Sequence, residues 1–422
     1  MEIAESQFHP LRAELAAEMH LRKLPPLEPG VRMAQIVMVP EDERSWAETD
    51  AHLAALCEAA GKPCDPASRF FRVAIGNSVF IWERHTEFAS FTFSRVAPEA
   101  DPFGEAPFAD LPPDWLGTLP RGVLRATRIA FVGGREAGAE AGLGDDPFRR
   151  EDLVCCDIAG GRARIWSDFR LHEDGFGRLL IADKGLSGLE AALSIQRVQE
   201  LGNYRNMALL GLPVAQGLTP EVSRLEQRLA ALTADIAGGS ADDEKALDEL
   251  SFLSAELARL MAETRYRMSA TKAYADIVAD RLRSLKVVKV EGHQTLADFT
   301  ERRLAPATRT CASFSARLED LSRRVNWTSD LMRTRVETAV SEQSRDLLAS
   351  MNRRTHLQLR LQQTVEGLSI VAISYYAVGL IAFIVAGIET GIDEELVVAL
   401  AVPPVVLVVW LAVLRLRRKV LD

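Results

Sequence analysis

Hydrophobic residues are concentrated in two long runs at the C-terminal end of this chain. The first run extends from Gly367 to Ile388 and the second from Leu396 to Leu414, and neither contains a charged residue. At about 1.5 Å per residue, a helix of either length could cross about 30 Å of hydrocarbon. We therefore predict a two-helix transmembrane hairpin with a basic tail over residues 367–422, with the lipid bilayer as its partner. A buried hairpin of a soluble core is the alternative.

The charges around these runs predict their orientation. Basic residues lie before the first run and after the second, at Arg353, Arg354, Arg360, Arg415, Arg417, Arg418 and Lys419. The connecting loop carries only acidic charges, at Glu389, Asp393, Glu394 and Glu395. Because basic flanks stay on the cytoplasmic side, we expect cytoplasmic N- and C-termini and an outer acidic loop. Such a loop could concentrate a cation, although exposed acids usually serve only solubility.

Residues 186–366 are predicted to form a helical stalk. A 3-4 spacing of mostly apolar residues runs from Leu247 to Leu285, which is typical of a coiled coil or long bundle. A second helix is expected to start near Pro306 and to continue into the first apolar run, after shorter helices over 186–201 and 220–236. Thr and Ser within the spacing leave two interpretations open: a helix face that meets water, as in a funnel, or a bundle with changing neighbours.

Residues 1–185 alternate short β-like runs with turn residues. Examples are VRMAQIVMV from Val31 and FFRVAIG from Phe70, and a helix is expected over 45–60. Many strands with few helices predict an α+β domain with a mostly antiparallel sheet, placed in the cytoplasm. The predicted fold is therefore an α+β cytoplasmic domain, a long α-helical coiled-coil-like stalk and the transmembrane hairpin.

Composition and charge narrow the function. A net charge of −9 argues against a nucleic-acid partner, because such proteins need a basic face. The first ten residues have no apolar core, which predicts no signal peptide. The cysteines are then expected to be buried reduced thiols, since their spacing matches no zinc template: Cys57, Cys64, Cys155, Cys156 and Cys311.

One segment could bind a metal. In IWERHTEF, period-2 alternation along a strand would place Glu83, His85 and Glu87 on one face, a row of carboxylate, imidazole and carboxylate. A solvated strand face with ion pairs is the alternative. The glycine-rich loop after Val132 lacks a Lys-Ser/Thr pair and carries acids that would repel phosphate, so we read it as a hairpin tip. No catalytic motif appears, and we expect no enzymatic activity and no cofactor.

Several of these blocks resemble a known family. HPLRAELAAEMHLRK, IWERHTEF, NYRNMALLGLPVA and TVEGLSIVAISYYAVGL, which begin at His9, Ile81, Asn203 and Thr364, are similar to a bacterial family of unknown function, DUF 3422. Where that family has His-Ala-Arg-Pro, this chain has HLRK from His20. The resemblance implies a two-span protein of the bacterial inner membrane and supplies no activity.

The order of segments also resembles CorA-type magnesium channels. Those proteins carry Gly-Met-Asn at the outer end of the first span, where this chain reads AGIETG from Ala386. The resemblance therefore implies the topology and a homo-oligomer without magnesium selectivity.

Three functions are compatible with these features. The first is an oligomeric ion channel or transporter, for which polar residues in the first span are the candidates: Ser369, Ser374, Tyr375 and Tyr376. The second is a membrane-anchored scaffold or regulator that binds a cytoplasmic partner, and the third is a tethered enzyme that uses the Glu83 row.

Overall fold

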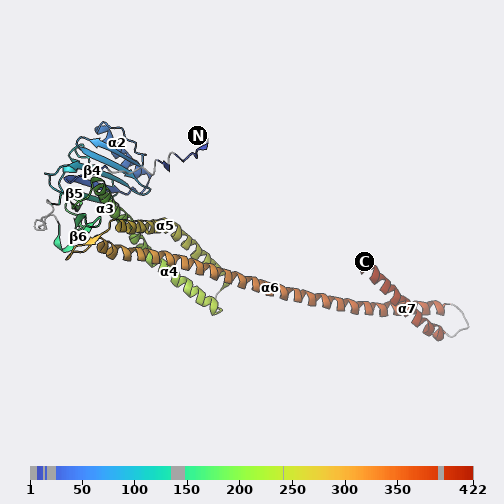
Figure 1. Cartoon of the computed structure of the whole chain (residues 1–422). Coiled ribbons are helices and arrows are strands. Elements are labelled where there is room, and N and C mark those ends of the chain that lie inside the picture. The colour runs from blue at the N-terminus through green and yellow to red at the C-terminus, as the bar shows by residue number, and fades with distance from the viewer. Residues whose placement is uncertain are drawn as a thin grey trace. The chain divides into compact units, whose positions relative to one another are not determined.

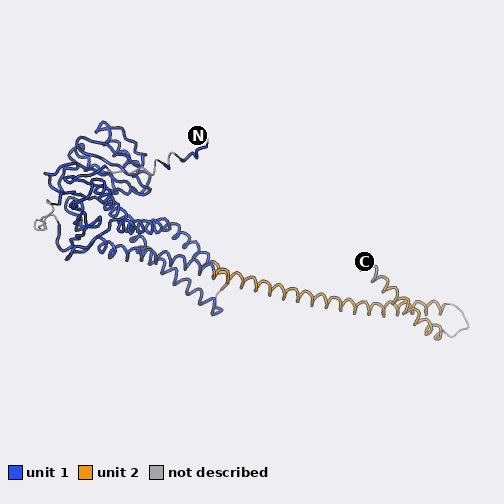
Figure 2. The backbone as a smooth tube through the Cα atoms, in the orientation of Figure 1, with its two compact units in different colours: residues 1–241, 248–326 blue, residues 242–247, 327–422 orange. Residues whose placement is uncertain are grey.

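The computed structural model describes residues 7–12, 15–16, 25–134, 148–240, 242–387 and 394–421. It divides into two compact units: unit 1 comprises 1–241 and 248–326, and unit 2 comprises 242–247 and 327–422 (Figure 2). The strands are β1 (Val31–Met38), β2 (Phe70–Ile75), β3 (Ser78–Arg84), β4 (Ala89–Val96), β5 (Val123–Val132), β6 (Val154–Ile158), β7 (Ala163–Ser167), β8 (Gly177–Asp183) and β9 (Val288–Lys289). The helices are α2 (Glu43–Ala59), α3 (Gly188–Leu209), α4 (Gly211–Ala237), α5 (Asp243–Ser284), α6 (Leu296–Ala386) and α7 (Glu394–Leu421), as Figure 1 shows.

The strands form one sheet, in which residues 31–183 supply all described strands except β9 from the segment between α5 and α6, and this confirms the predicted α+β class. Within the described residues its order is β2-β3-β4-β1-β5-β8-β7-β6-β9. Neighbouring strands are antiparallel except β5 and β8, which are parallel from Thr127 opposite Gly177. The prediction of a mostly antiparallel sheet is therefore confirmed.

Both faces of the sheet are covered, and period-2 alternation assigns each residue to one face. In β1, Met33 and Val37 pack with residues of α3, whereas Ile36 and Met38 pack with Leu53 and other residues of α2. All eight residues of β1 are buried for this reason. The α3 side also receives the end of α5 and the start of α6, so that the sheet and these helices share one core.

The helices after the sheet are longer than the sequence pattern predicted. A capping box between Ser187 and Glu190 starts α3, which continues to Leu209 rather than ending near 201. The next helix, α4, begins at Gly211 instead of Pro220. Pro220 lies inside it at an exposed position, where the helix tolerates the missing backbone donor.

The start of α6 also differs from the prediction. Thr295 Oγ1 accepts a hydrogen bond from the Asp298 backbone at 3.0 Å, and Asp298 Oδ2 accepts one from the Thr295 backbone at 3.2 Å. This cap starts the helix at Leu296, and Pro306 lies within its 91 residues rather than near its first turn. The expectation that Pro306 marks the start of the helix was wrong because the Thr295 cap, eleven residues earlier, satisfies first-turn donors.

In unit 1, α4, α5 and α6 are joined by ion pairs. Arg228 of α4 contacts Glu249 of α5 at 2.7 Å, and Arg317 of α6 contacts Glu226 of α4 at 2.7 Å. The predicted seam of α5 includes buried threonines, and Thr264 satisfies its own hydroxyl by donating to the Leu260 carbonyl at 2.7 Å. A seam threonine that bonds its own helix does not need water, which favours the bundle interpretation for this part of α5.

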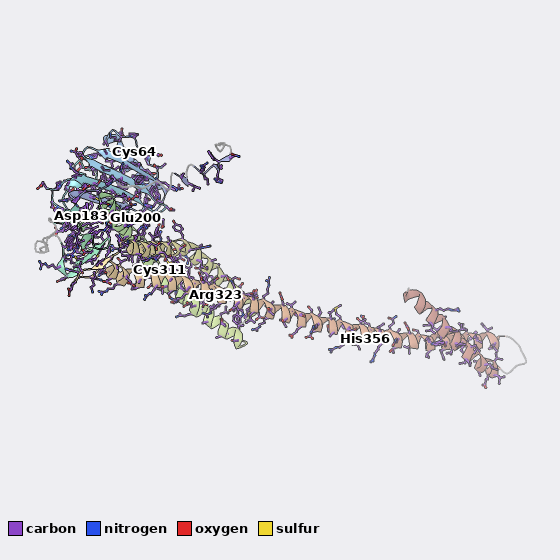
Figure 3. The ribbon with its side chains drawn as sticks, in the orientation of Figure 1. Cys64, Asp183, Glu200, Cys311, Arg323 and His356 are labelled. Atoms are coloured by element: carbon purple, nitrogen blue, oxygen red, sulfur yellow. A yellow bond between two sulfur atoms is a disulfide. The ribbon has the colours of Figure 1, made fainter. Side chains whose placement is uncertain are left out.

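Within unit 2, a long part of α6 has only exposed side chains, and we call it the bare segment. Every residue from Glu337 to Val365 is exposed, including the segment around His356 that Figure 3 marks. Apolar side chains with 55% to 75% exposure recur at multiples of seven residues, at Val340, Leu347, Leu361, Leu368 and Tyr375, and Arg354 takes the one remaining position of the series. We call these five residues the α6 stripe.

The cysteines correct one expectation. Cys57, at the end of α2, forms a disulfide with Cys64, with a Cα–Cα distance of 5.9 Å. Cys155, Cys156 and Cys311 are buried thiols, as expected. The expectation of free thiols at Cys57 and Cys64 was wrong because the turn after α2 brings these two residues, seven positions apart, close together.

Candidate functional site

Two helices of unit 2 have the length and composition to cross a membrane among the residues that the structure describes. They are the C-terminal part of α6 and the segment Glu395–Arg415 of α7. Large apolar side chains on both are exposed, for example Leu368 at 71%, Phe383 at 86% and Leu400 at 69%. Water would disfavour this surface, whereas hydrocarbon would accommodate it. The two helices are therefore the candidate membrane-spanning segments.

The polar residues of the first candidate span lie in different environments. Ser369 donates its hydroxyl to the Val365 carbonyl at 2.7 Å, as serines in apolar helices commonly do. Ser374 is only 5% exposed, and its hydroxyl has no hydrogen-bond partner among the described residues. Tyr375 and Tyr376 are 75% and 72% exposed. Of the four candidates, only these tyrosines therefore present their side chains strongly to the surroundings.

Residues 358–369 of α6 and Val413 of α7 line one hollow in unit 2. Val413 of α7 lines it together with Leu361, Val365 and Ser369 of α6, and its volume is about 370 Å³. Ser369, one of the predicted polar candidates, therefore lines the same hollow as a residue of the second apolar helix.

The acidic loop is largely outside the described residues. Glu389 and Asp393 are not described, and for Glu394 only its place at the start of α7 is given. Glu395 is exposed in the first turn of α7. Acids in a first turn interact favourably with the helix dipole, so Glu395 has a structural role there that needs no cation.

The predicted metal row does not share one strand face. β3 ends at Arg84, and the His85 backbone donates to the Phe88 carbonyl at 2.8 Å in a turn. The His85 ring stacks on Phe88 at 4.0 Å, and Glu87 pairs with Arg267 of α5. The third residue, Glu83, accepts a hydrogen bond from Ser90 at 3.2 Å. No group of three His, Cys, Asp or Glu residues that could hold a metal occurs in the described part of the chain.

The family can now be stated from comparison with known proteins. A family model described as a protein of unknown function, DUF3422, matches residues 7–420. The chain belongs to the DUF3422 family. No curated protein and no solved structure matches it. The match includes the sheet, the helices and both candidate spans, so these parts together form the DUF3422 unit.

One group of residues in this DUF3422 chain was missed by the sequence patterns. Arg125 of β5, Arg205 of α3 and Arg303 of α6 gather around shared contacts in unit 1. Arg125 bonds Asn203 of α3, two residues before Arg205, and the guanidinium groups of Arg205 and Arg303 lie 5.6 Å and 4.4 Å from the centre of the same Phe299 ring. In the sequence, the feature that could have indicated this group is the charged side chain of Arg125. In β5 it alternates with Ile129 and Phe131 on the face that packs against α3, where a charged residue is unusual.

Proposed function

We propose that this DUF3422 protein is a homo-oligomer of the bacterial inner membrane, with CorA-like topology and a pore for ions. In this proposal α6 and α7 form a transmembrane hairpin, both termini lie in the cytoplasm and the acidic loop lies outside. No enzymatic step is part of it.

The observation that carries the proposal is the α6 stripe. A seven-residue apolar period matches the seam of a left-handed coiled coil, in which equivalent residues of several helices meet. The stripe continues from the exposed segment of α6 into the candidate span, where Leu368 and Tyr375 belong to it. This helix face, interrupted at Arg354, would then associate with other copies both before and within the membrane.

Tyr375 is the residue that this arrangement assigns to the axis. It lies on the stripe, whereas Tyr376 is turned by about 100° around the helix. Tyrosine hydroxyls that line an axis could contact a passing ion as weak acceptors, while the outer acids raise the local cation concentration. We therefore propose a cation as the transported species.

A flux assay tests the pore. Full-length protein is reconstituted into vesicles that contain a potassium-sensitive dye, and potassium entry is followed after a voltage is imposed. We expect entry above that of protein-free vesicles, a changed rate in Tyr375→Ala and an unchanged rate in Tyr376→Ala. Equal rates in the presence and absence of protein would contradict the pore.

A second function is favoured by one observation. Within the described residues, the apolar runs 367–387 and 396–414 include no Asp, Glu, Lys, Arg or His, the side chains that transport sites commonly use. A membrane-anchored scaffold or regulator that binds a cytoplasmic partner explains the same segments without a pore. Monomeric protein in detergent together with absent flux would favour this second function.

A further inference from the structure

We propose that the three arginines between β5, α3 and α6 form a binding site for a small soluble phosphate ester or pyrophosphate. The site lies in unit 1 and does not depend on the proposed pore. We call Arg125, Arg205 and Arg303 the arginine site.

Arg125 is fixed in place by neutral acceptors. Its Nη1 donates to Gln35 Oε1 at 3.0 Å and to Asn203 Oδ1 at 2.9 Å. Gln35 is itself oriented because its Nε2 donates to Thr92 Oγ1 at 3.2 Å. Amide oxygens satisfy donors but bring no negative charge. Among the described residues, no ion pair neutralises this guanidinium.

Arg125 also requires a glycine beneath it. A Cβ atom added to Gly202 of α3 would lie 2.8 Å from the guanidinium carbon of Arg125. The absence of a side chain at Gly202 therefore lets the guanidinium lie against the helix backbone.

Arg205 is held by aromatic rings instead of acids. Its guanidinium lies 4.6 Å from the ring centre of Phe169 and 5.6 Å from that of Phe299, and these two rings stack at 4.4 Å. Its Nη1 is buried without a hydrogen-bond partner among the described residues. Phe169 takes a positive φ of 52°, a conformation that costs energy for a bulky residue.

The charges of the group are not balanced. Burial and the charge of Arg205 lower the pKa of Arg125 to about 9, while burial and the charge of Arg303 lower the pKa of Arg205 to about 10. Both therefore remain cationic at neutral pH, and the nearby charges that act on them are repulsive. Arg303 lies over the Phe299 ring at 4.4 Å and is exposed, whereas Arg125 and Arg205 are half-buried.

An unused donor points to a ligand as well. Gln199 is 4% exposed, and its Nε2 has no partner within the described residues. It lies one helical turn before Asn203, on the same face of α3 that contacts Arg125. Buried donors of this kind are normally satisfied, and an anion with several acceptor oxygens would satisfy it.

Phosphate matches these requirements better than a carboxylate. Guanidinium groups bind phosphate oxygens in a bidentate manner, and a phosphate monoester carries about −1.5 to −2 charges at neutral pH with three acceptor oxygens. A single carboxylate carries one charge and two oxygens. The site also lies outside the candidate membrane spans, which favours a soluble source over a lipid headgroup.

Thermal unfolding of the full-length protein in detergent tests this site. Pyrophosphate is added at constant ionic strength, with potassium chloride, succinate and dioctanoyl phosphatidic acid as comparison arms. We expect Tm to rise with pyrophosphate and not with chloride or succinate, because a ligand that binds only the folded state stabilises it. No rise with pyrophosphate would overturn the proposal, and a rise with the lipid alone would overturn the soluble source.

Variants separate binding from folding. Arg205→Met and Arg303→Met should raise the pyrophosphate Kd at least tenfold, whereas Arg353→Met, which removes an equal charge from the exposed part of α6, should leave it unchanged. Gly202→Ala retains all three charges but displaces Arg125, so we expect normal folding in the absence of ligand with weakened binding. Unchanged affinity in Arg303→Met and Gly202→Ala would overturn the assignment even if Arg205→Met failed to fold.

Discussion

Arg267 of α5 forms an ion pair with Glu87, which lies in the short connection between β3 and β4. The two residues are separated by 180 positions, and both side chains are largely buried. The pair therefore joins the sheet to the helices that follow it. Glu87, one member of the predicted metal row, is therefore buried and occupied by this ion pair.

Breaking this pair should destabilise unit 1. Burial lowers the pKa of Arg267, so loss of Glu87 would leave a cation withdrawn from water without its carboxylate. We expect Glu87→Gln to reduce the free energy of unfolding by roughly 3 kcal/mol, the range for a buried pair that loses one partner. Denaturation of the full-length protein in detergent, followed by tryptophan fluorescence, measures this change.

The matched control for this prediction is Arg265→Met, two residues away at an exposed position of α5. Its loss should alter the free energy of unfolding by less than about 0.5 kcal/mol. If Glu87→Gln behaved like Arg265→Met, the ion pair would not be a stabilising link between the sheet and α5.

The cap of α3 predicts a pH dependence. Hydrogen bonds from Ser187 and the contact with Arg162 lower the pKa of Glu190 to about 2, from an ordinary value of 4.5. Since the folded-state pKa is depressed, this stabilisation is fully present above about pH 4.5 and is lost as the pH falls toward 2. We expect Glu190→Gln to lower Tm at pH 7 and this difference to shrink at lower pH. Glu173→Gln, at an exposed position without a cap, should show no such pH dependence.

The disulfide predicts a redox effect. Reduction of Cys57–Cys64 should destabilise the protein by roughly 2 kcal/mol, because the bond closes a short loop after α2. Tm measured with and without dithiothreitol checks this, and Cys57→Ser should abolish the response.

The same pair tests the proposed orientation. In a reducing cytoplasm, both cysteines should be alkylated as free thiols when cells are quenched in acid and the protein is alkylated under denaturing conditions, which are needed because Cys57 is buried in the folded protein. Alkylation only after chemical reduction would contradict a cytoplasmic location for this part of the chain and would favour the opposite orientation.

The α6 stripe predicts contacts between copies. In a background without other cysteines, Leu361→Cys should form a disulfide-linked dimer in membranes under mild oxidation, since Leu361 lies on the stripe. Gln363→Cys, turned by about 200° around the helix, should stay monomeric. Equal crosslinking at both positions would argue against a defined seam.

The sequence alone predicted the elements that depend on local composition. The run from Gly367 and the run from Leu396 are long and uncharged, so both apolar helices were predictable without knowledge of tertiary structure. The predicted helix starts were less accurate. Proline is favourable in the first turn of a helix, but a helix also tolerates it at exposed interior positions such as Pro220 and Pro306. Caps such as Thr295 with Asp298 decide the start, and short polar motifs of this kind are common outside helices.

Features that depend on distant segments were beyond sequence patterns. The arginine site combines one residue each from β5, α3 and α6, and Arg125 and Asn203 alone are 78 positions apart. The expectation that Glu83, His85 and Glu87 share one strand face was wrong for a local reason: alternation was continued through His85, where the strand has ended and the backbone turns. Period-2 patterns cannot locate the end of a strand when the turn residues are also polar.

The unbroken course of α6 through its bare segment restricts which insertions and deletions the gene could tolerate. Removing one residue between Glu337 and Val365 would rotate every later side chain by about 100° relative to the earlier ones. Removing seven would turn them by only about 20° and keep the apolar period in phase. Natural length variants of this segment should therefore differ by whole heptads, whereas other length changes would need a compensating change farther along the helix.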